Sequence, residues 1–147
     1  MKTLKVSDAM NRDIVVVDEG VSIKEAAKLM REKVSGCAIV LTKSRPIGMV
    51  TERDITYKVA GEGLDPNSVR VKEIMSTPLI TIDPDADLME AAKLMERHKI
   101  RRLAVARGEI LYGIINAADI ARHLEGYVDQ EIRRILRSVF FPSPGRL

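Results

Sequence analysis

The feature that most constrains the fold of this chain is an internal repeat. The segment Glu25-Ala-Ala-Lys-Leu-Met30 recurs letter for letter as Glu90-Ala-Ala-Lys-Leu-Met95, 65 positions further along. The same offset relates four further pairs of residues, which are Met10 and Met75, Asp18 and Asp83, Gly48 and Gly113, and Asp54 and Asp119. We align the copies with one extra residue in the second, between Met95 and Ile100, which is regained in the next loop. A repeat of this length indicates two similar units, each too small to bury its hydrophobic face alone.

The first half of each copy predicts a strand followed by a helix. Residues 14–17 and 79–82 are short apolar runs rich in β-branched side chains, as is typical of buried strands. Ser22 and Asp87 stand three residues before Glu25 and Glu90, which indicates a capping box at the start of each helix. The apolar stripe that follows has helical spacing in both copies, with Ile23, Ala26, Ala27 and Met30 in the first and Leu88, Ala91, Ala92 and Met95 in the second.

The second half of each copy predicts two more strands and a closing helix. We expect second strands at residues 37–41 and 103–106 and third strands at 47–50 and 112–115, with Pro46 and Gly108 in the turns between them. Each third strand runs into a helix that begins near Thr51 in one copy and near Asn116 in the other. The predicted fold class is therefore mixed α/β, of the α+β kind, with a β-α-β-β-α unit occurring twice.

The predicted organisation is a first unit at residues 4–60, a polar linker at 61–69, and a second unit at 70–125. Residues 126–147 complete the chain as an amphipathic helix, with its pattern over 127–139, and a tail. One face of that helix carries Ile132, Ile135, Leu136 and Val139, whereas Arg133, Arg134 and Arg137 lie elsewhere. Such a stripe must pack on something. In order of preference, we expect its own module, a second copy by helix exchange, or an acidic surface or nucleic acid.

Composition places the chain among soluble globular proteins. Apolar residues make up 46% and charged residues 31%, and the net charge of +3 does not by itself call for nucleic acid. No apolar run approaches the roughly 20 residues that span a bilayer, and the first residues lack the apolar core of a signal peptide. We therefore expect a cytoplasmic protein without a membrane contact.

Reactive side chains are few and scattered. Cys37 lies in an apolar run without a second cysteine and is expected to be a buried hydrophobe, while His98 and His123 lack metal-ligand spacing and are expected at the surface. No nucleophile and base pair, metal-ligand cluster or phosphate-binding loop is apparent. The sequence therefore predicts no catalytic residue, no metal, no cofactor and no enzymatic activity.

Three motifs, in order and mostly in both copies, resemble the cystathionine β-synthase (CBS) domain over about residues 4–125. They are an opening segment, Val6-Ser-Asp-Ala-Met10 and Val71-Lys-Glu-Ile-Met75, a middle strand within residues 99–105, and a closing motif, Gly48-Met-Val-Thr-Glu-Arg-Asp54. The resemblance implies a tandem pair, called a Bateman module, with pseudo-twofold symmetry and clefts that in many members hold AMP, ADP, ATP or S-adenosylmethionine. It also suggests a homodimer that passes ligand occupancy to an effector protein.

The resemblance marks one candidate ligand site and a poorer one. At the first, Asp54 suits ribose hydroxyls, Thr51 a phosphate at a helix start and Met49 the base. By family likeness, Leu79 and Ile80 lie beside adenine, and Arg101 and Arg102 reach phosphates. The weaker second site comprises Ile14, Ser35, Gly36, Asn116 and Asp119.

Other interpretations of these residues stay open at this point. Thr51 with Asp54, and Asn116 with Asp119, are also adequate helix caps with an acid in the first turn. For the whole chain, the alternatives are a nucleic-acid-binding protein, an S-adenosylmethionine sensor and a structural dimer that binds no ligand. Arg101, Arg102 and the arginines of the last helix support the first of these, although aromatic residues make up only 3% of the chain.

Overall fold

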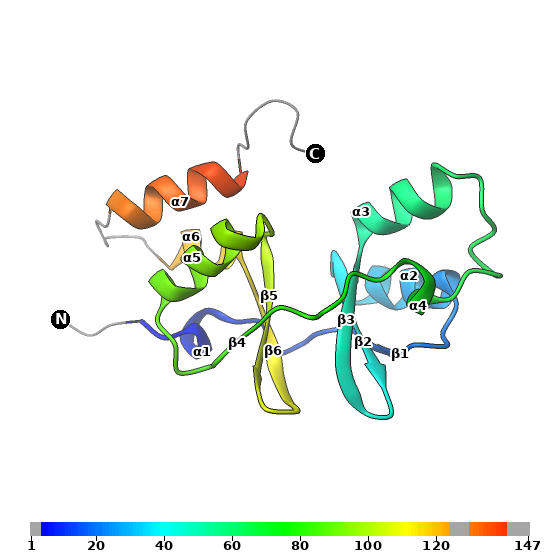
Figure 1. Ribbon diagram of the computed structural model, residues 1–147, viewed down its shortest axis with the longest axis horizontal. Coiled ribbons are helices and arrows are strands. Elements are labelled where there is room, and N and C mark those ends of the chain that lie inside the picture. The colour runs from blue at the N-terminus through cyan, green and yellow to red at the C-terminus, as the bar shows by residue number, and fades with distance from the viewer. Residues whose placement is uncertain (1–3, 124–129, 141–147) are drawn as a thin grey trace. The chain divides into compact units, whose positions relative to one another are not determined.

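Two compact units divide the chain. The computed structural model describes residues 4–123 and 130–140. One unit comprises residues 13–80, and the other comprises residues from 81 onward together with those up to 12 (Figure 1). We call them the 13–80 unit and the 81–147 unit. Each contains one three-stranded sheet with helices, as the repeat predicts.

The 13–80 unit has a sheet of order β1-β2-β3. Its strands are β1 (Val16–Asp18), β2 (Cys37–Thr42) and β3 (Arg45–Thr51), and β2 pairs parallel with β1 and antiparallel with β3. The helices are α2 (Ile23–Glu32), α3 (Glu52–Asp54), which continues into the π-helix η1 (Ile55–Ala60), and α4 (Val71–Ile74). The amide N–H of Glu25 donates to the Ser22 hydroxyl at 3.2 Å, which confirms the predicted start of α2.

The 81–147 unit repeats this order. Its sheet is β4 (Thr81–Ile82), β5 (Arg102–Arg107) and β6 (Ile110–Asn116), with β4 parallel and β6 antiparallel to β5. The helices are α1 (Val6–Ala9), α5 (Leu88–His98), α6 (Ala117–Arg122) and α7 (Gln130–Phe140). Asp87 caps α5 by accepting from the Glu90 amide at 2.8 Å.

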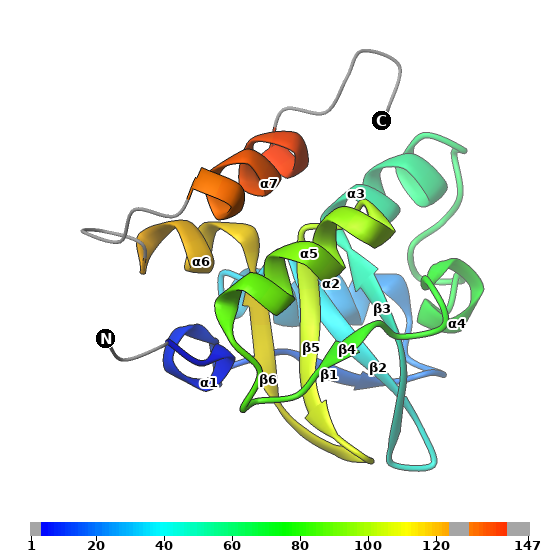
Figure 2. The ribbon, with the colours of Figure 1, turned by 60° about the vertical axis from the view of Figure 1, so that its left-hand side comes forward.

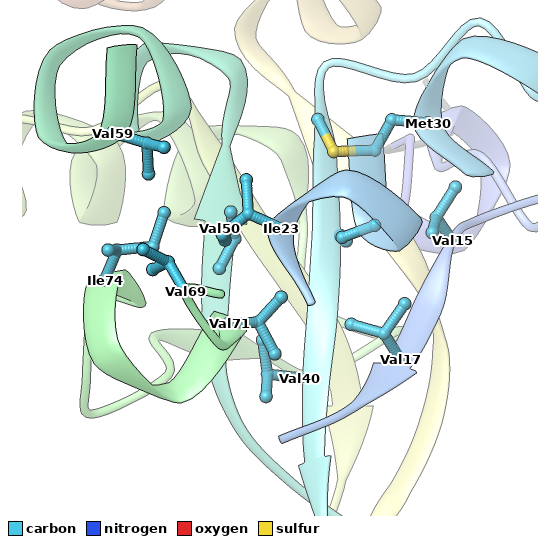
Figure 3. Close-up of a cluster of buried hydrophobic side chains, with 12 residues drawn as sticks. Val15, Val17, Ile23, Met30, Val40, Val50, Val59, Val69, Val71 and Ile74 are labelled. Carbon is cyan, nitrogen blue, oxygen red and sulfur yellow. The ribbon is translucent and has the colours of Figure 1, made fainter. Parts of the chain in front are cut away.

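The core of the 13–80 unit lies between the sheet and the helices α2 and α4 (Figure 3). Ile23, Ala26 and Met30, three of the four residues in the predicted helical stripe, are at most 5% exposed. They pack in one cluster with Ala38 and Val40 of β2. The remaining buried residues of the cluster are Val15, Val17, Val50, Val59, Val69, Val71 and Ile74.

The opening segments of the two repeats change places. Helix α1 opens the first repeat but joins the 81–147 unit, where the amides of Val6 and Ser7 donate to the carbonyl oxygens of Ala86 and Pro84 at 2.8 and 3.0 Å. Helix α4 opens the second repeat but joins the 13–80 unit, where the Val71 amide donates to Val21 at 2.9 Å. Each compact unit therefore takes its short opening helix from the other repeat.

A glycine in each third strand admits the exchanged segment. Met49 of β3 and Ser76 exchange two backbone hydrogen bonds of 3.1 and 2.9 Å, and Ile114 of β6 and Asn11 do the same at 3.0 and 2.8 Å. A Cβ on Gly48 would stand 2.8 Å from the Ser76 carbonyl oxygen, and one on Gly113 would clash with the carbonyl oxygen of Asn11. These glycines are needed for close backbone approach rather than for an unusual φ.

The strand pairing corrects the alignment of the two copies. Cys37 pairs with Thr51 and Arg102 with Asn116, so the offset of 65 holds through the second strands. The prediction of an extra residue in the second copy, between Met95 and Ile100, is therefore wrong. Gly36 and Cys37 therefore occupy the positions equivalent to Arg101 and Arg102, because backbone pairing rather than side-chain similarity sets the register.

Two local predictions also need correction. Pro46 lies within β3, opposite Leu41, and not in the turn. The turn consists of Lys43 and Ser44, both with positive φ, which suits the twist of a two-residue hairpin. The first strands begin two residues later than predicted, at Val16 and Thr81, because pairing with the second strand starts only there. The short helices α1 and α4 were not predicted.

Helix α7 packs on α5 and α6 of its own unit, the preferred prediction for the tail (Figure 2). Ile132, Ile135 and Leu136 are buried. Arg134 and Ser138 contact the carboxylate of Glu96 on α5 at 3.2 and 3.3 Å. The predicted start of the helix at 127–129 and the tail at 141–147 lie outside the described residues. Among the described residues, none of the helices combines the length and the hydrophobicity of a membrane-spanning segment.

We expect Gly48→Ala to destabilise the fold by about 1–3 kcal/mol, since the added methyl group clashes with the Ser76 backbone. Urea unfolding measures this loss. Gly20→Ala is the matched control, because a Cβ there would meet only the Asp18 carboxylate at 3.7 Å, an ordinary contact. Equal stability of the two variants would contradict the steric role of Gly48.

The segment exchange predicts where two equivalent core substitutions act. Val6 and Val71 are both completely buried, and Val→Ala at either site costs about 1–3 kcal/mol. Val6→Ala is expected to speed amide hydrogen exchange in β5 and β6, and Val71→Ala in β2 and β3. The reverse pattern, in which each substitution loosens the strands of its own repeat, would refute the exchange.

Candidate functional site

Thr51 and Asp54 form a reciprocal cap at the start of the helix that follows β3. The Asp54 amide donates to the Thr51 hydroxyl oxygen at 3.1 Å. In return, Asp54 Oδ2 accepts from the Thr51 amide at 2.9 Å and from its hydroxyl at 3.1 Å. The capping interpretation of this pair is therefore realised, and it occupies one carboxylate oxygen and the threonine hydroxyl.

The other oxygen of Asp54 faces a lysine from the next helical turn. Lys58 Nζ lies 3.0 Å from Asp54 Oδ1 and also donates to the Ile74 carbonyl oxygen at 2.9 Å. The Asp54 side chain is 12% exposed, whereas that of Lys58 is 47% exposed. A largely buried carboxylate is thus neutralised by a half-exposed cation, which in turn holds the last residue of α4.

The helix start at Thr51 offers fewer free donors than the sequence suggests. The Glu52 amide donates to the Gly36 carbonyl oxygen at 2.9 Å, and the Asp54 amide is bound to Thr51. An anion that reached this point would compete with both hydrogen bonds. A phosphate therefore needs cationic side chains here more than it needs the helix start.

Met49, Leu79 and Ile80 belong to the same unit as Asp54. Met49 lies on β3, two residues before Thr51, and its backbone pairs with Ser76. Leu79 and Ile80 follow Ser76 along the chain and are partly buried. They lie immediately before β4 and not, as predicted, within a strand. The exchange of opening segments thus brings these two residues into the unit that carries Asp54.

Arg101 and Arg102 lie in the 81–147 unit. Arg101 is exposed, and its carbonyl oxygen accepts from the Ala117 amide at 2.8 Å. Arg102 is partly buried and begins β5 opposite Asn116. Neither guanidinium group has an ion-pair partner within the described part of the chain.

The residues of the predicted weaker site are also divided between the units. Asn116 and Asp119 repeat the reciprocal cap with distances of 2.9 and 2.8 Å, and Arg122 pairs with Asp119 Oδ1. Ile14, Ser35 and Gly36 lie in the 13–80 unit. The Ser35 hydroxyl donates to the Cys37 carbonyl oxygen at 2.8 Å, so it is already bound within its own loop.

The remaining reactive side chains are placed as predicted. Cys37 is buried at 3% exposure, and His98 and His123 are exposed, although His123 Nδ1 contacts the Asp119 carbonyl oxygen at 2.8 Å. Within residues 4–123 and 130–140, no group of three or more His, Cys, Asp or Glu side chains is arranged to hold a metal ion. Elsewhere, hydrogen bonds from Arg107 and the Asp85 amide lower the pKa of Asp83 to about 2.

Comparison with protein families gives two matches. The family model described as the CBS domain matches residues 6–61 and 71–126. Hypoxic response protein 1 of Mycobacterium tuberculosis is 37% identical over 118 residues, covering 80% of this chain and 82% of that protein. Uncharacterized protein MJ1404 of Methanocaldococcus jannaschii is 36% identical over 137 residues, covering 84% of this chain but only 32% of that protein.

Solved structures share the fold. A hexameric CBS-CP12 protein from bloom-forming cyanobacteria has a TM-score of 0.81 at 34% identity, covering 88% of this chain and 78% of that one. The CBS domain pair of protein MJ0100 was solved in complex with 5-methylthioadenosine and S-adenosyl-L-methionine. It has a TM-score of 0.75 at 23% identity, covering 86% of this chain and all of that one, so it shows the fold alone.

Thr51→Ala is expected to lower the free energy of unfolding by about 1 kcal/mol, because the cap loses its side-chain acceptor. Thr51→Ser keeps a hydroxyl at the same place and should retain most of the stability. Thermal and urea unfolding of both variants measure the difference. Equal stability of the alanine and serine variants would show that the hydroxyl does not cap this helix.

Proposed function

The chain belongs to the CBS domain family and carries two copies of the domain, and on this premise we propose that it is a regulatory module that binds an adenine nucleotide. The proposed ligand is AMP, ADP or ATP. The proposed module performs no catalysis of its own and acts by passing its occupancy to a partner protein. The MJ0100 pair supports the ligand class only at the level of the fold, since its structure holds adenosine derivatives.

The observation that carries the proposal is the environment of Asp54. Its side chain is 12% exposed, belongs to α3 directly after β3, and keeps Oδ1 outside the reciprocal cap. Met49 of β3 and the apolar pair Leu79 and Ile80 are in the same unit. A carboxylate for ribose hydroxyls and apolar side chains for a purine are the groups that adenosine recognition requires.

The phosphate contacts are proposed on the family resemblance. Arg101 and Arg102 are the candidates, and the unpaired state of their guanidinium groups in the described residues leaves them available for an anion. Guanidinium groups bind phosphate through charge-assisted, often paired hydrogen bonds. Because the amides of Glu52 and Asp54 at this helix start already donate hydrogen bonds within the protein, we propose that the two arginines supply most of the phosphate affinity.

We also propose that the two sites are unequal. The repeat alignment from the strand pairing places Gly36 and Cys37 where the second copy has Arg101 and Arg102. The weaker site at Ile14, Ser35, Gly36, Asn116 and Asp119 therefore lacks an equivalent pair of cations. Losing one charge-assisted hydrogen bond is enough for about a tenfold loss in affinity.

Coupling to a partner follows from population shift. A ligand that binds one arrangement of the module better than another raises the population of that arrangement, and a bound effector protein can respond to it. We propose a homodimer as the assembly that does so. The related cyanobacterial protein is hexameric, which supports self-association as a property of relatives.

Isothermal calorimetry with AMP, ADP, ATP, S-adenosylmethionine and a short DNA duplex tests the function. We expect one adenine nucleotide to bind, and both Asp54→Ala and Arg101→Ala to weaken it about tenfold or more. Arg133→Ala, on the exposed side of α7, is the matched control and should leave the affinity unchanged. Unchanged affinity in both site variants would refute the site, and salt-dependent duplex binding without a nucleotide effect would favour a nucleic-acid-binding protein.

A further inference from the structure

Lys58 contacts the oxygen of Asp54 that lies outside the reciprocal cap. Oδ2 already accepts two hydrogen bonds from Thr51, at 2.9 and 3.1 Å. Oδ1 accepts from the Lys58 ammonium group at 3.0 Å. A ribose hydroxyl that donates to Asp54 must therefore approach Oδ1, where the lysine lies.

The same lysine also holds the end of α4. Its ammonium group donates to the carbonyl oxygen of Ile74, the last residue of that helix, at 2.9 Å. The chain continues from Ile74 through Met75 to Ser76, which pairs with Met49, and then to Leu79 and Ile80. Lys58 is thus the side chain that joins the proposed sugar-binding carboxylate to the segment that carries the proposed adenine contacts.

We propose that Lys58 is an internal competitor for the ligand and that its displacement signals occupancy to α4. This inference rests on the proposed function and adds its regulation. When a ribose hydroxyl takes Oδ1, the ammonium group loses its main anionic partner and its hold on the Ile74 carbonyl oxygen weakens with it. The empty site therefore has an ordered α4 end, and the occupied site a freer one.

Exposure makes this exchange energetically accessible. The Lys58 side chain is 47% exposed, so its charge can be hydrated when it leaves. Asp54, at 12% exposure, needs a substitute donor when this cation leaves. The second copy has a comparable ion pair, because Arg122 pairs with Asp119 Oδ1 while Oδ2 stays in the cap. An arginine can form a second hydrogen bond to the carboxylate, so the 13–80 unit has the more easily opened pair.

Calorimetry with adenosine and AMP tests the inference in the full chain. Lys58→Met keeps the length of the side chain but removes its charge, and is expected to bind both probes about two- to fivefold more tightly, which corresponds to about 0.4–1 kcal/mol for a half-exposed ion pair. Lys58→Arg keeps the charge and can form a second hydrogen bond to the carboxylate, so it should bind both probes no more tightly than the wild type. Lys28→Met, an exposed lysine on α2 in the same unit, is the matched control and should change nothing.

Hydrogen exchange supplies a second readout that does not depend on affinity. Adenosine is expected to speed amide exchange at residues 74–76 in the wild type, and Lys58→Met should show that faster exchange without ligand. Weaker AMP binding with unchanged adenosine binding in Lys58→Met would instead identify Lys58 as a phosphate ligand and overturn the inference.

The variants separate competition by Lys58 from ligand binding at Asp54. If Asp54→Ala abolishes binding while Lys58→Met binds like the wild type and exchanges like it, the competition is refuted and the ligand site stands. If neither the wild type nor Lys58→Met binds adenosine or AMP, or if Asp54→Ala binds as well as the wild type, both are refuted.

Discussion

The close backbone contact between each third strand and the segment that follows an exchanged helix is the constraint on which the rest of the structure depends. Met49 pairs with Ser76 and Ile114 with Asn11, and each contact exists because Gly48 or Gly113 has no side chain. These contacts commit the opening helix of one repeat to the body of the other. The repeats consequently cannot be separated at their sequence boundaries without removing part of a core, as the burial of Val6 and Val71 shows.

This constraint also assembles the proposed site. Helix α4 arrives in the 13–80 unit with the exchange, and the residues after it bring Leu79 and Ile80 into the unit that contains Asp54. The closing motif therefore has three separate tasks. Gly48 admits the exchanged backbone, Thr51 caps the helix, and Asp54 divides its two oxygens between that cap and Lys58. Capping and ligand binding are compatible because they use different oxygens of the same carboxylate.

Much of this could be predicted from the sequence, because hydrophobic periodicity and helix caps are local. The strands, the starts of α2 and α5, and the buried Cys37 all follow from such patterns. The segment exchange could not be predicted, because Val6 and Val71 open motifs so alike that neither sequence states on which repeat it packs. Register is a long-range property for the same reason. Matching Ala38 with Ala104 by residue type would give an offset of 66 between the second strands. Their backbone pairing with β3 and β6 instead fixes the offset at 65.

The one candidate-site residue that sequence reasoning missed had a local signal. Lys58 stands four residues after Asp54, the spacing at which an acid and a base meet on a helix. This spacing does not reveal the second hydrogen bond of Lys58, to the Ile74 carbonyl oxygen, because that group belongs to the exchanged helix α4.

The packing of α7 shows how small differences between the copies give each its own role. Helices α2 and α5 share the repeated six residues, so both offer a lysine at the same place, Lys28 and Lys93, and Lys93 lies 3.7 Å from Glu131 of α7. The next turn differs, because Glu96 of α5, which pairs with Arg134, is replaced in α2 by Arg31. Docked on α2 in the same register, α7 would bring two arginines together. The charges on this turn therefore favour α5 over α2 as the partner of α7, although the apolar stripes of the two helices are nearly the same.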